Sequence, residues 1–162
     1  SAPEEKTYTE SDIKILTSSS KEALKTYGNK FGAIISAPFP KGYEHELAIV
    51  VRVNDTGNTE DLKKLDQNIA RYRTIRDQLV ALPVPHSLIK PHLGFINSLS
   101  AMLEGVRGMT LIESDPVGAT KMIARYQDNL AALSLPALEM KAYFKKQSVV
   151  FSSLESGYLL TK

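Results

Sequence analysis

The strongest constraint on the fold is a helical repeat near the carboxyl-terminal end of the chain. Over residues 115–146, apolar side chains recur alternately four and three residues apart, and an α-helix places residues at this spacing on one face. The series consists of Ala119, Ile123, Tyr126, Leu130, Leu133, Ala137, Met140 and Phe144. An apolar stripe of this length must be covered by other helices, which favours a helical bundle.

Pro136 lies inside this repeat. Proline has no amide donor, and its ring obstructs the carbonyl four residues earlier, here that of Ala132. A break with an intervening loop would reset the register, but the apolar register continues across Pro136. The sequence therefore predicts one long helix over residues 115–146, kinked at the proline and about 45 Å long at a rise of about 1.5 Å per residue.

Three other segments carry helical repeats. One follows the serines at 18–20, any of which can cap a first turn, and should end before Pro38. Another begins at Asn58 or Thr59 and runs to about residue 82. The sequence LPVP then predicts a rigid hinge, and the helix after it extends to about Gly108. The apolar arc of this last helix is so wide that we expect it to be the central helix.

The remaining segments are less regular. Residues 44–53 are rich in β-branched side chains and fit either a short buried helix or a strand; helical signals on both sides favour the helix. Thr9 and Asp12 resemble a capping box, which predicts a short first helix. The residues after 147 lack a helical period and predict a short extended tail, packed along the bundle or mobile.

Composition limits the organisation of the chain. With 162 residues, 43% of them hydrophobic, it suits one domain with a substantial core. We expect residues 1–7 to be a disordered lead-in or linker remnant and residues 8–162 to form a single domain. No apolar run reaches the roughly 20 residues that span a bilayer. The predicted fold class is all-α: an antiparallel helical bundle with one long proline-kinked carboxyl-terminal helix and a short extended tail.

No motif in the chain predicts catalysis or a cofactor. There are no cysteines, which excludes disulfides, thiolate metal sites and cysteine nucleophiles. Serines occur without a nucleophile elbow, and no glycine-rich phosphate loop is present. The acidic residues lack the Glu-x-x-His pairs of di-iron bundles. We therefore predict that the protein is not an enzyme and has no catalytic residue, metal ligand or cofactor.

The histidines offer the nearest alternatives. His45 lies in YEHEL between Glu44 and Glu46, but this spacing is not the two-histidine zinc motif, so a metal site is not predicted. His92 lies on the apolar stripe of the expected central helix and is interpreted as a core or boundary histidine with one hydrogen-bond partner. An enzyme would require a polar pocket around His92 with a perturbed titratable group.

Glycines and other small residues recur within the helical patterns. Gly28 and Gly32 lie one turn apart and are better explained by close packing than by phosphate binding. Gly94, Ser98, Ala101, Gly105 and Gly108 form a similar stripe on the expected central helix. We expect close helix packing at Gly28 and Gly32, and another backbone to approach the stripe on the central helix closely.

Basic residues do not predict a nucleic-acid site. The net charge is only +2, and Arg71, Arg73 and Arg76 form at most a partial stripe diluted by Asp77. Binding of nucleic acid needs several clustered cations. We predict a solvated face with ion pairs and no nucleic-acid partner.

A proline-rich segment supplies the candidate contact site for a partner. The sequence SAPFPKGYE predicts a loop that carries Phe39, Pro40 and Tyr43. Its two rings either fold back onto the core, which is the favoured interpretation, or face a partner.

Several phrases of the chain resemble known sequences. YTESDIKIL, ALKTYGNKFGAII, LPVPHSLIKPHLGFINSLSAML and SDPVGATKMIARYQ resemble uncharacterised helical proteins of candidate phyla radiation bacteria (Patescibacteria). Such proteins are commonly membrane-anchored or exported, and some are associated with type IV pilus or secretion machinery. The resemblance implies an extracytoplasmic domain, periplasmic or on the cell surface, but assigns no functional residue.

Together these observations predict a non-enzymatic extracytoplasmic interaction or scaffold domain, associated with a bacterial envelope, pilus or secretion apparatus. Its partner would be a protein, and it would be tethered to the membrane only through a segment absent from this chain. The alternative is a cytoplasmic nucleic-acid-binding or regulatory helical module.

Overall fold

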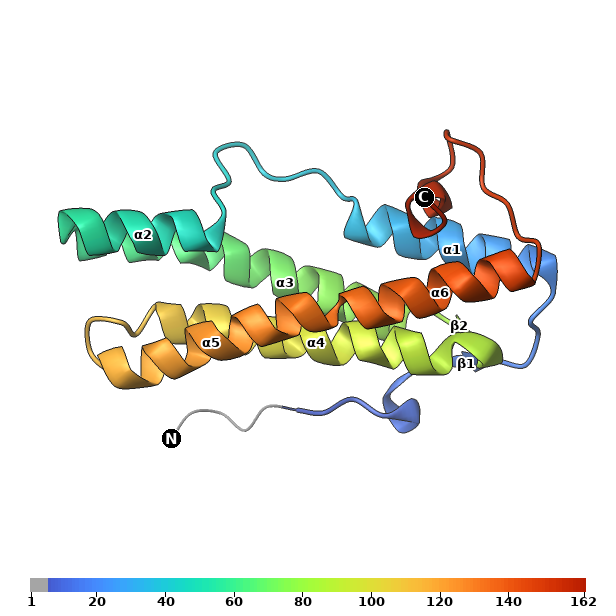
Figure 1. The fold of residues 1–162 in the computed structure, drawn as a ribbon, viewed down its shortest axis with the longest axis horizontal. Helices are drawn as coiled ribbons and strands as arrows, with labels where there is room; N and C mark the ends of the chain where they lie inside the picture. Colours follow the sequence, from blue (N-terminus) through green and yellow to red (C-terminus); the bar gives the residue numbers. More distant parts are fainter. Residues whose placement is uncertain (1–5) are drawn as a thin grey trace.

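Helix α4 (Ile89–Met109) is the central element of the computed structural model, which describes residues 6–162 (Figure 1). It contributes to both hydrophobic clusters of the core. The other α-helices are α1 (Lys21–Ile35), α2 (Glu46–Thr56), α3 (Leu65–Ala81), α5 (Pro116–Ala132) and α6 (Ser134–Lys146). The predicted all-α class and the predicted central helix are therefore confirmed.

The two clusters divide the core along the long axis of the molecule. One joins α1, α3, the first half of α4, α6 and the chain after α6. The other joins α2, the beginning of α3, the second half of α4, and α5. In Figure 1 the chain runs out along α4 and returns along α5 and α6. Gly105 and Gly108 permit this close return, because a Cβ atom at either position would lie within 2.6 Å of an α5 side chain.

The segment predicted as one helix over residues 115–146 is divided into α5 and α6. The division falls at Leu133, whose torsion angles (φ −62°, ψ −23°) remain helical, and Pro136 is the third residue of α6. Because proline has no amide hydrogen, the main-chain hydrogen bond from position 136 to the carbonyl of Ala132 is missing, and the helix is interrupted one turn before Pro136. The predicted apolar stripe is only partly buried: Tyr126, Met140 and Phe144 are fully buried, but Leu130 and Ala137, on either side of the division, are exposed.

The predicted short first helix is confirmed only in part. Residues Glu10–Asp12 form only a 3₁₀ turn, with the capping box at Thr9, and the chain then becomes strand β1 (Ile15–Leu16). This strand pairs in parallel with β2 (Val84–Pro85), which lies inside the expected LPVP hinge. Backbone pairing with a distant segment has replaced the local helical hydrogen bonds, and strands of two residues show no periodicity in the sequence.

Residues 44–53 belong to a helix, as favoured, because α2 extends over Glu46–Thr56 and ends at Gly57 in the left-handed region (φ +67°). The helix expected from residue 58 begins as a 3₁₀ helix over Thr59–Lys64 and becomes α3 at Leu65. The helix expected before Pro38 is α1, and the Ser20 side chain caps it by accepting from the amide of Ala23.

The tail is more structured than predicted. Val149 and Phe151 are buried in an extended stretch, which agrees with the expectation of a tail packed along the bundle. The chain then forms a 3₁₀ helix over Ser156–Leu160. This turn packs on α1. A Cβ atom on Gly32 would lie 2.1 Å from the Ser156 carbonyl oxygen, and one on Gly28 would lie 2.4 Å from the Phe151 ring. Close packing at both glycines is confirmed, but the partner is the tail and not another α-helix as predicted.

Of the expected lead-in over residues 1–7, residues 1–5 lie outside the described part of the chain. Lys6 forms an ion pair with Asp12 at 2.8 Å. The backbone of Tyr8 exchanges two hydrogen bonds with the side chain of Asn97 on α4, at 2.8 and 3.1 Å. Within residues 6–162, no helix combines the length and apolar character needed to cross a membrane.

Candidate functional site

The predicted contact residues lie on the α1–α2 loop (residues 36–45), and the structure brings two of them together. The rings of Phe39 and Tyr43 stack with their centroids 4.6 Å apart. The guanidinium of Arg71, on α3, lies 4.0 Å from the centroid of the Phe39 ring. The same guanidinium donates hydrogen bonds to the carbonyls of Ala37 at 2.8 Å and Pro38 at 3.2 Å. Arg71 thus attaches the first half of the loop to α3.

The two rings face different surroundings. Tyr43 is partly buried, and its hydroxyl accepts from Asn68 Nδ2 at 3.1 Å. Phe39 is 62% exposed and Pro40 is also exposed. A turn separates them, in which the Tyr43 amide donates to the Pro40 carbonyl and Gly42 adopts a positive φ of 78°. The favoured prediction, that both rings fold back onto the core, therefore holds for Tyr43 only. Most of the Phe39 ring is exposed to solvent.

Directly after the loop, the carboxylate of Glu46 is fully buried. It is the first residue of α2, a position where a negative charge interacts favourably with the helix dipole. His45 caps this helix by accepting from the Leu47 amide at 3.2 Å. The carboxylate accepts hydrogen bonds from Tyr72 at 2.6 Å and from Tyr126, which joins α2 to α3 and α5.

Further groups complete the surroundings of this carboxylate. Asn68 Nδ2 donates to it at 2.7 Å, the Tyr43 hydroxyl lies 3.4 Å away, and His45 Nε2 lies 3.9 Å away. Burial alone would raise the pKa of Glu46, but the hydrogen bonds from Tyr126 and Tyr72 outweigh it and place the pKa below its ordinary value. Burial and the neighbouring carboxylate raise the pKa of Tyr72. Glu46 is therefore ionised and the tyrosines are hydroxyl donors at neutral pH.

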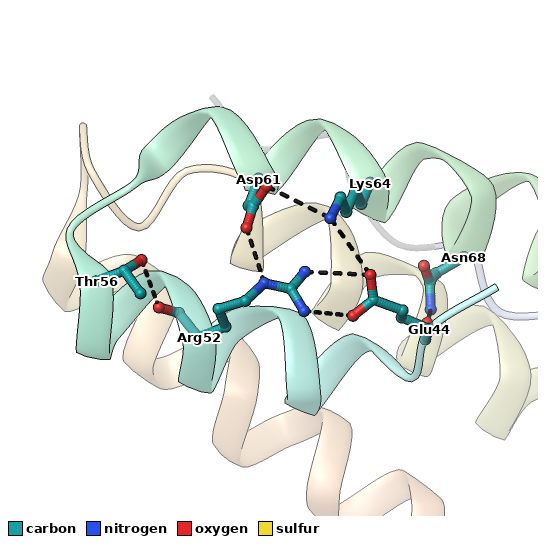
Figure 2. A network of polar contacts seen from close by, with 6 residues as sticks. All are labelled: Glu44, Arg52, Thr56, Asp61, Lys64 and Asn68. Carbon is teal, nitrogen blue, oxygen red and sulfur yellow. Dashed lines mark hydrogen bonds and ion pairs between the residues drawn. The ribbon is translucent and has the colours of Figure 1, made fainter. Parts of the chain in front are cut away.

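An ion-pair network attaches the second half of the loop (Figure 2). Arg52 makes a two-pronged pair with Glu44 and donates through Nε to Asp61 at 2.8 Å. Lys64 lies 3.4 Å from Glu44 and 3.5 Å from Asp61. Asn68 donates to the Glu44 carbonyl at 2.9 Å. The Arg52 guanidinium lowers the pKa of Glu44, so the pair remains charged at neutral pH.

Two hollows flank the loop. One, of about 310 Å³, lies between residues 37–40 and α3, and its lining includes Ile34, Pro38, Pro40 and Ile75. The other, of about 460 Å³, is polar and is lined by Lys41, Lys63, Lys64, Glu44 and Gln67. Phe39 is therefore exposed between a mixed apolar groove and a basic hollow. This arrangement can contact a macromolecule.

His92 is a core histidine, as predicted, with two polar partners instead of one. It is fully buried on α4, and its ring nitrogens contact the Tyr27 hydroxyl and the Leu79 carbonyl, each at 2.8 Å. Burial lowers the pKa of His92 to about 4. Within residues 6–162, no cluster of three or more histidine or acidic side chains is arranged to hold a metal ion.

The predicted arginine stripe is divided between structural contacts. Arg71 contacts the loop, and Arg76 pairs with Asp77 at 2.8 Å. The buried network around Glu46 was not predicted, since YEHEL was considered only as a metal motif. Its signal was indirect: Tyr72 and Tyr126 occupy apolar stripes, and a buried tyrosine hydroxyl requires a partner.

Comparison of the chain with protein-family models, with curated proteins and with solved structures gave no match in any of the three.

Proposed function

We propose that this chain is a non-enzymatic interaction domain that binds a protein partner through Phe39 and the surrounding α1–α2 loop. The observation that carries the proposal is the contrast between the exposed Phe39 ring and the firm attachment of its loop. Arg71 attaches one half of the loop, and Tyr43 and Glu44 attach the other. A loop ordered before binding loses little conformational entropy when a partner arrives.

The side chains of the loop suit a protein interface. Aromatic residues and arginine dominate the energetics of such interfaces, and the stacked pair of Phe39 and Arg71 supplies both. The adjoining groove of about 310 Å³ offers space for a partner side chain. The fixed support of α2 by the Glu46 network keeps the loop in one position relative to α3 and α5.

We infer further that the helices act as one antiparallel bundle in which α5 and α6 behave as a single proline-kinked unit. The helical torsion angles of Leu133 and the end-to-end arrangement of the two helices in Figure 1 support this. A rigid scaffold of this kind suits the display of a loop. The extracytoplasmic location, the membrane tether outside this chain and the link to an envelope, pilus or secretion apparatus rest on the resemblance to Patescibacterial proteins.

The test begins with a photo-crosslinking amino acid at position 39 of the full-length protein in its native cells. The crosslinked protein is identified and purified, and its affinity for the chain is measured by titration calorimetry. We expect Phe39→Ala to weaken binding at least about tenfold, the loss of a hot-spot residue. Val51→Ala, which truncates an exposed residue of α2, is the matched control. Equal affinity of Phe39→Ala and wild type would refute the proposal.

Location is tested separately, by protease accessibility of the full-length protein in intact cells and in cells with opened envelopes. Digestion before lysis of the cytoplasmic membrane supports an extracytoplasmic domain, and protection until lysis contradicts it. The alternative of a nucleic-acid-binding module predicts salt-dependent binding to random-sequence DNA through Lys41, Lys63 and Lys64. Absence of such binding at low salt would remove that alternative.

A further inference from the structure

A second surface, distinct from the α1–α2 loop, lies where α6 meets the carboxyl-terminal 3₁₀ helix. A cavity of about 280 Å³ opens there, with Phe95 and Leu160 of the core in its lining. Leu138, which is 63% exposed, and Leu159, which is 39% exposed, also line it. We call this the α6 groove. Its size and apolar lining suit one or two large apolar side chains of a partner, as interface anchors require.

The helical surface beside the α6 groove is unusually apolar. No charged residue occurs between Asp128 and Glu139, and most side chains in this interval are exposed. Leu130 and Leu135 are among them. A surface helix normally presents charged and polar residues to water. An exposed apolar surface that continues into a groove is typical of an interaction site.

The charge at the rim indicates what the groove would accept. Its lining includes Lys141 and Lys162 and no acidic residue. Lys141 donates to the main-chain oxygen of Lys162 at 2.8 Å, and the exposed Lys145 follows one turn later on the same face of α6. The nearest acidic residue along α6, Glu139, is paired with Lys90 at 3.3 Å. The rim is therefore positive.

We propose that the α6 groove docks an acidic amphipathic segment of a partner protein, with leucine-like side chains in the groove and carboxylates against Lys141 and Lys145. Charge complementarity selects this occupant, because opposite charges at the rim of an interface favour the correct partner and suppress others. A second copy of the chain is disfavoured, since it would bring the same lysines to the same rim. The bound segment must be amphipathic because the exposed residues of α6 are apolar at Leu135 and Leu138 and basic afterwards.

The experiment uses the full 162-residue chain with methyl-labelled leucine and isoleucine and two synthetic helical peptides. Both peptides carry leucines on one face; the other face carries glutamates in one and lysines in the other. We expect only the glutamate peptide to shift the methyl resonances of Leu138, Leu159 and Ile35. Lys141→Glu combined with Lys145→Glu should weaken that binding at least tenfold and permit binding of the lysine peptide.

Substitutions distinguish the groove from the rest of the surface. Leu138→Glu should abolish binding of the glutamate peptide without affecting thermal unfolding, since this side chain is mostly exposed. Val51→Glu, on the exposed side of α2, should leave binding unchanged. Phe39→Ala should also leave it unchanged, so failure of the groove and failure of the α1–α2 loop are separate outcomes.

Four results would overturn the proposal. They are equal binding of the two peptides, absence of shifts with either peptide, self-association that Leu138→Glu removes, and binding to phosphatidylglycerol vesicles that Leu138→Glu removes. The third result would identify a second copy as the occupant, and the fourth would identify a lipid surface.

Discussion

Tyr27 donates a hydrogen bond to Nδ1 of His92, and this contact determines how the histidine links three helices. Nε2 contacts the carbonyl of Leu79, which can only accept, so Nε2 carries the proton of the neutral ring. Nδ1 is then an acceptor for the Tyr27 hydroxyl at 2.8 Å. A proton added to Nδ1 would remove that acceptor. The neutral ring on α4 therefore satisfies both Tyr27 on α1 and Leu79 on α3, whereas the charged ring would offer the Tyr27 hydroxyl a donor instead of an acceptor.

Acidification should weaken the fold through His92. The pKa of His92 is about 4 in the folded protein, against an ordinary value of 6.5 in the unfolded chain, so the unfolded chain binds more protons between these limits. The stabilising contribution is fully present above about pH 6.5 and declines as the pH falls toward about 4, by about 3 kcal/mol at about 1.4 kcal/mol per pKa unit. Urea unfolding measured at pH 7 and at pH 4.5 tests this.

The control for this prediction is the exposed His86. His86→Gln should retain the pH dependence of wild type, whereas His92→Gln should lose most of it between pH 6.5 and pH 4.5. If His92→Gln and wild type lose stability in parallel over that interval, the histidine is not the group responsible.

Glu46→Gln should destabilise the protein by about 2 kcal/mol at pH 7, because hydrogen bonds to an ionised acceptor are replaced by weaker ones. Because the pKa of Glu46 is below its ordinary value of 4.5, its stabilising contribution is present above pH 4.5 and is lost as the pH falls through the folded-state pKa. The difference between variant and wild type should therefore shrink in acid. Glu60→Gln, at an exposed site, should change stability by less than about 0.5 kcal/mol. If Glu46→Gln leaves the free energy of unfolding unchanged at pH 7, the buried carboxylate does not have this structural role.

Gly32→Ala should detach the carboxyl-terminal 3₁₀ helix from α1. The new methyl group would lie 2.1 Å from the Ser156 carbonyl oxygen, and this backbone atom cannot move without the whole turn. We expect a net loss of about 1–3 kcal/mol and faster proteolysis within residues 149–160. Gly94→Ala is the milder comparison, since its methyl group would approach the Pro136 ring at 3.2 Å. Unchanged proteolysis of the tail in Gly32→Ala would show that the packing tolerates the methyl group.

Pro136→Ala should make α5 and α6 continuous. The substitution restores an amide opposite the carbonyl of Ala132, and amide hydrogen exchange should detect new protection at position 136. Pro116→Ala is the matched control, because Pro116 is the first residue of α5, where an amide has no helical partner. Rapid exchange at position 136 would show that the division at Leu133 does not depend on the proline.

The helices were predictable because their signals are local. Apolar spacing identified α4 as central and placed a helix from residue 115 onward. The pairing of Ile15 with Val84 was not predictable, since two-residue strands from distant segments leave no periodic pattern. The Glu46 network was missed for the same reason: its donors come from Asn68, Tyr72 and Tyr126, and only the tertiary fold brings them to one carboxylate.

The contact between α1 and the carboxyl-terminal turn has a consequence for biosynthesis. The Asn29 side chain accepts from the Gly157 amide, and these residues are 128 positions apart. At about 5–20 residues per second, α1 leaves the ribosome about 6 to 26 s before the turn that covers Gly28 and Gly32 is made. During this interval the apolar face of α1 lacks its final cover. The cluster around α1 therefore closes late in synthesis, only after residues 149–160 have been made.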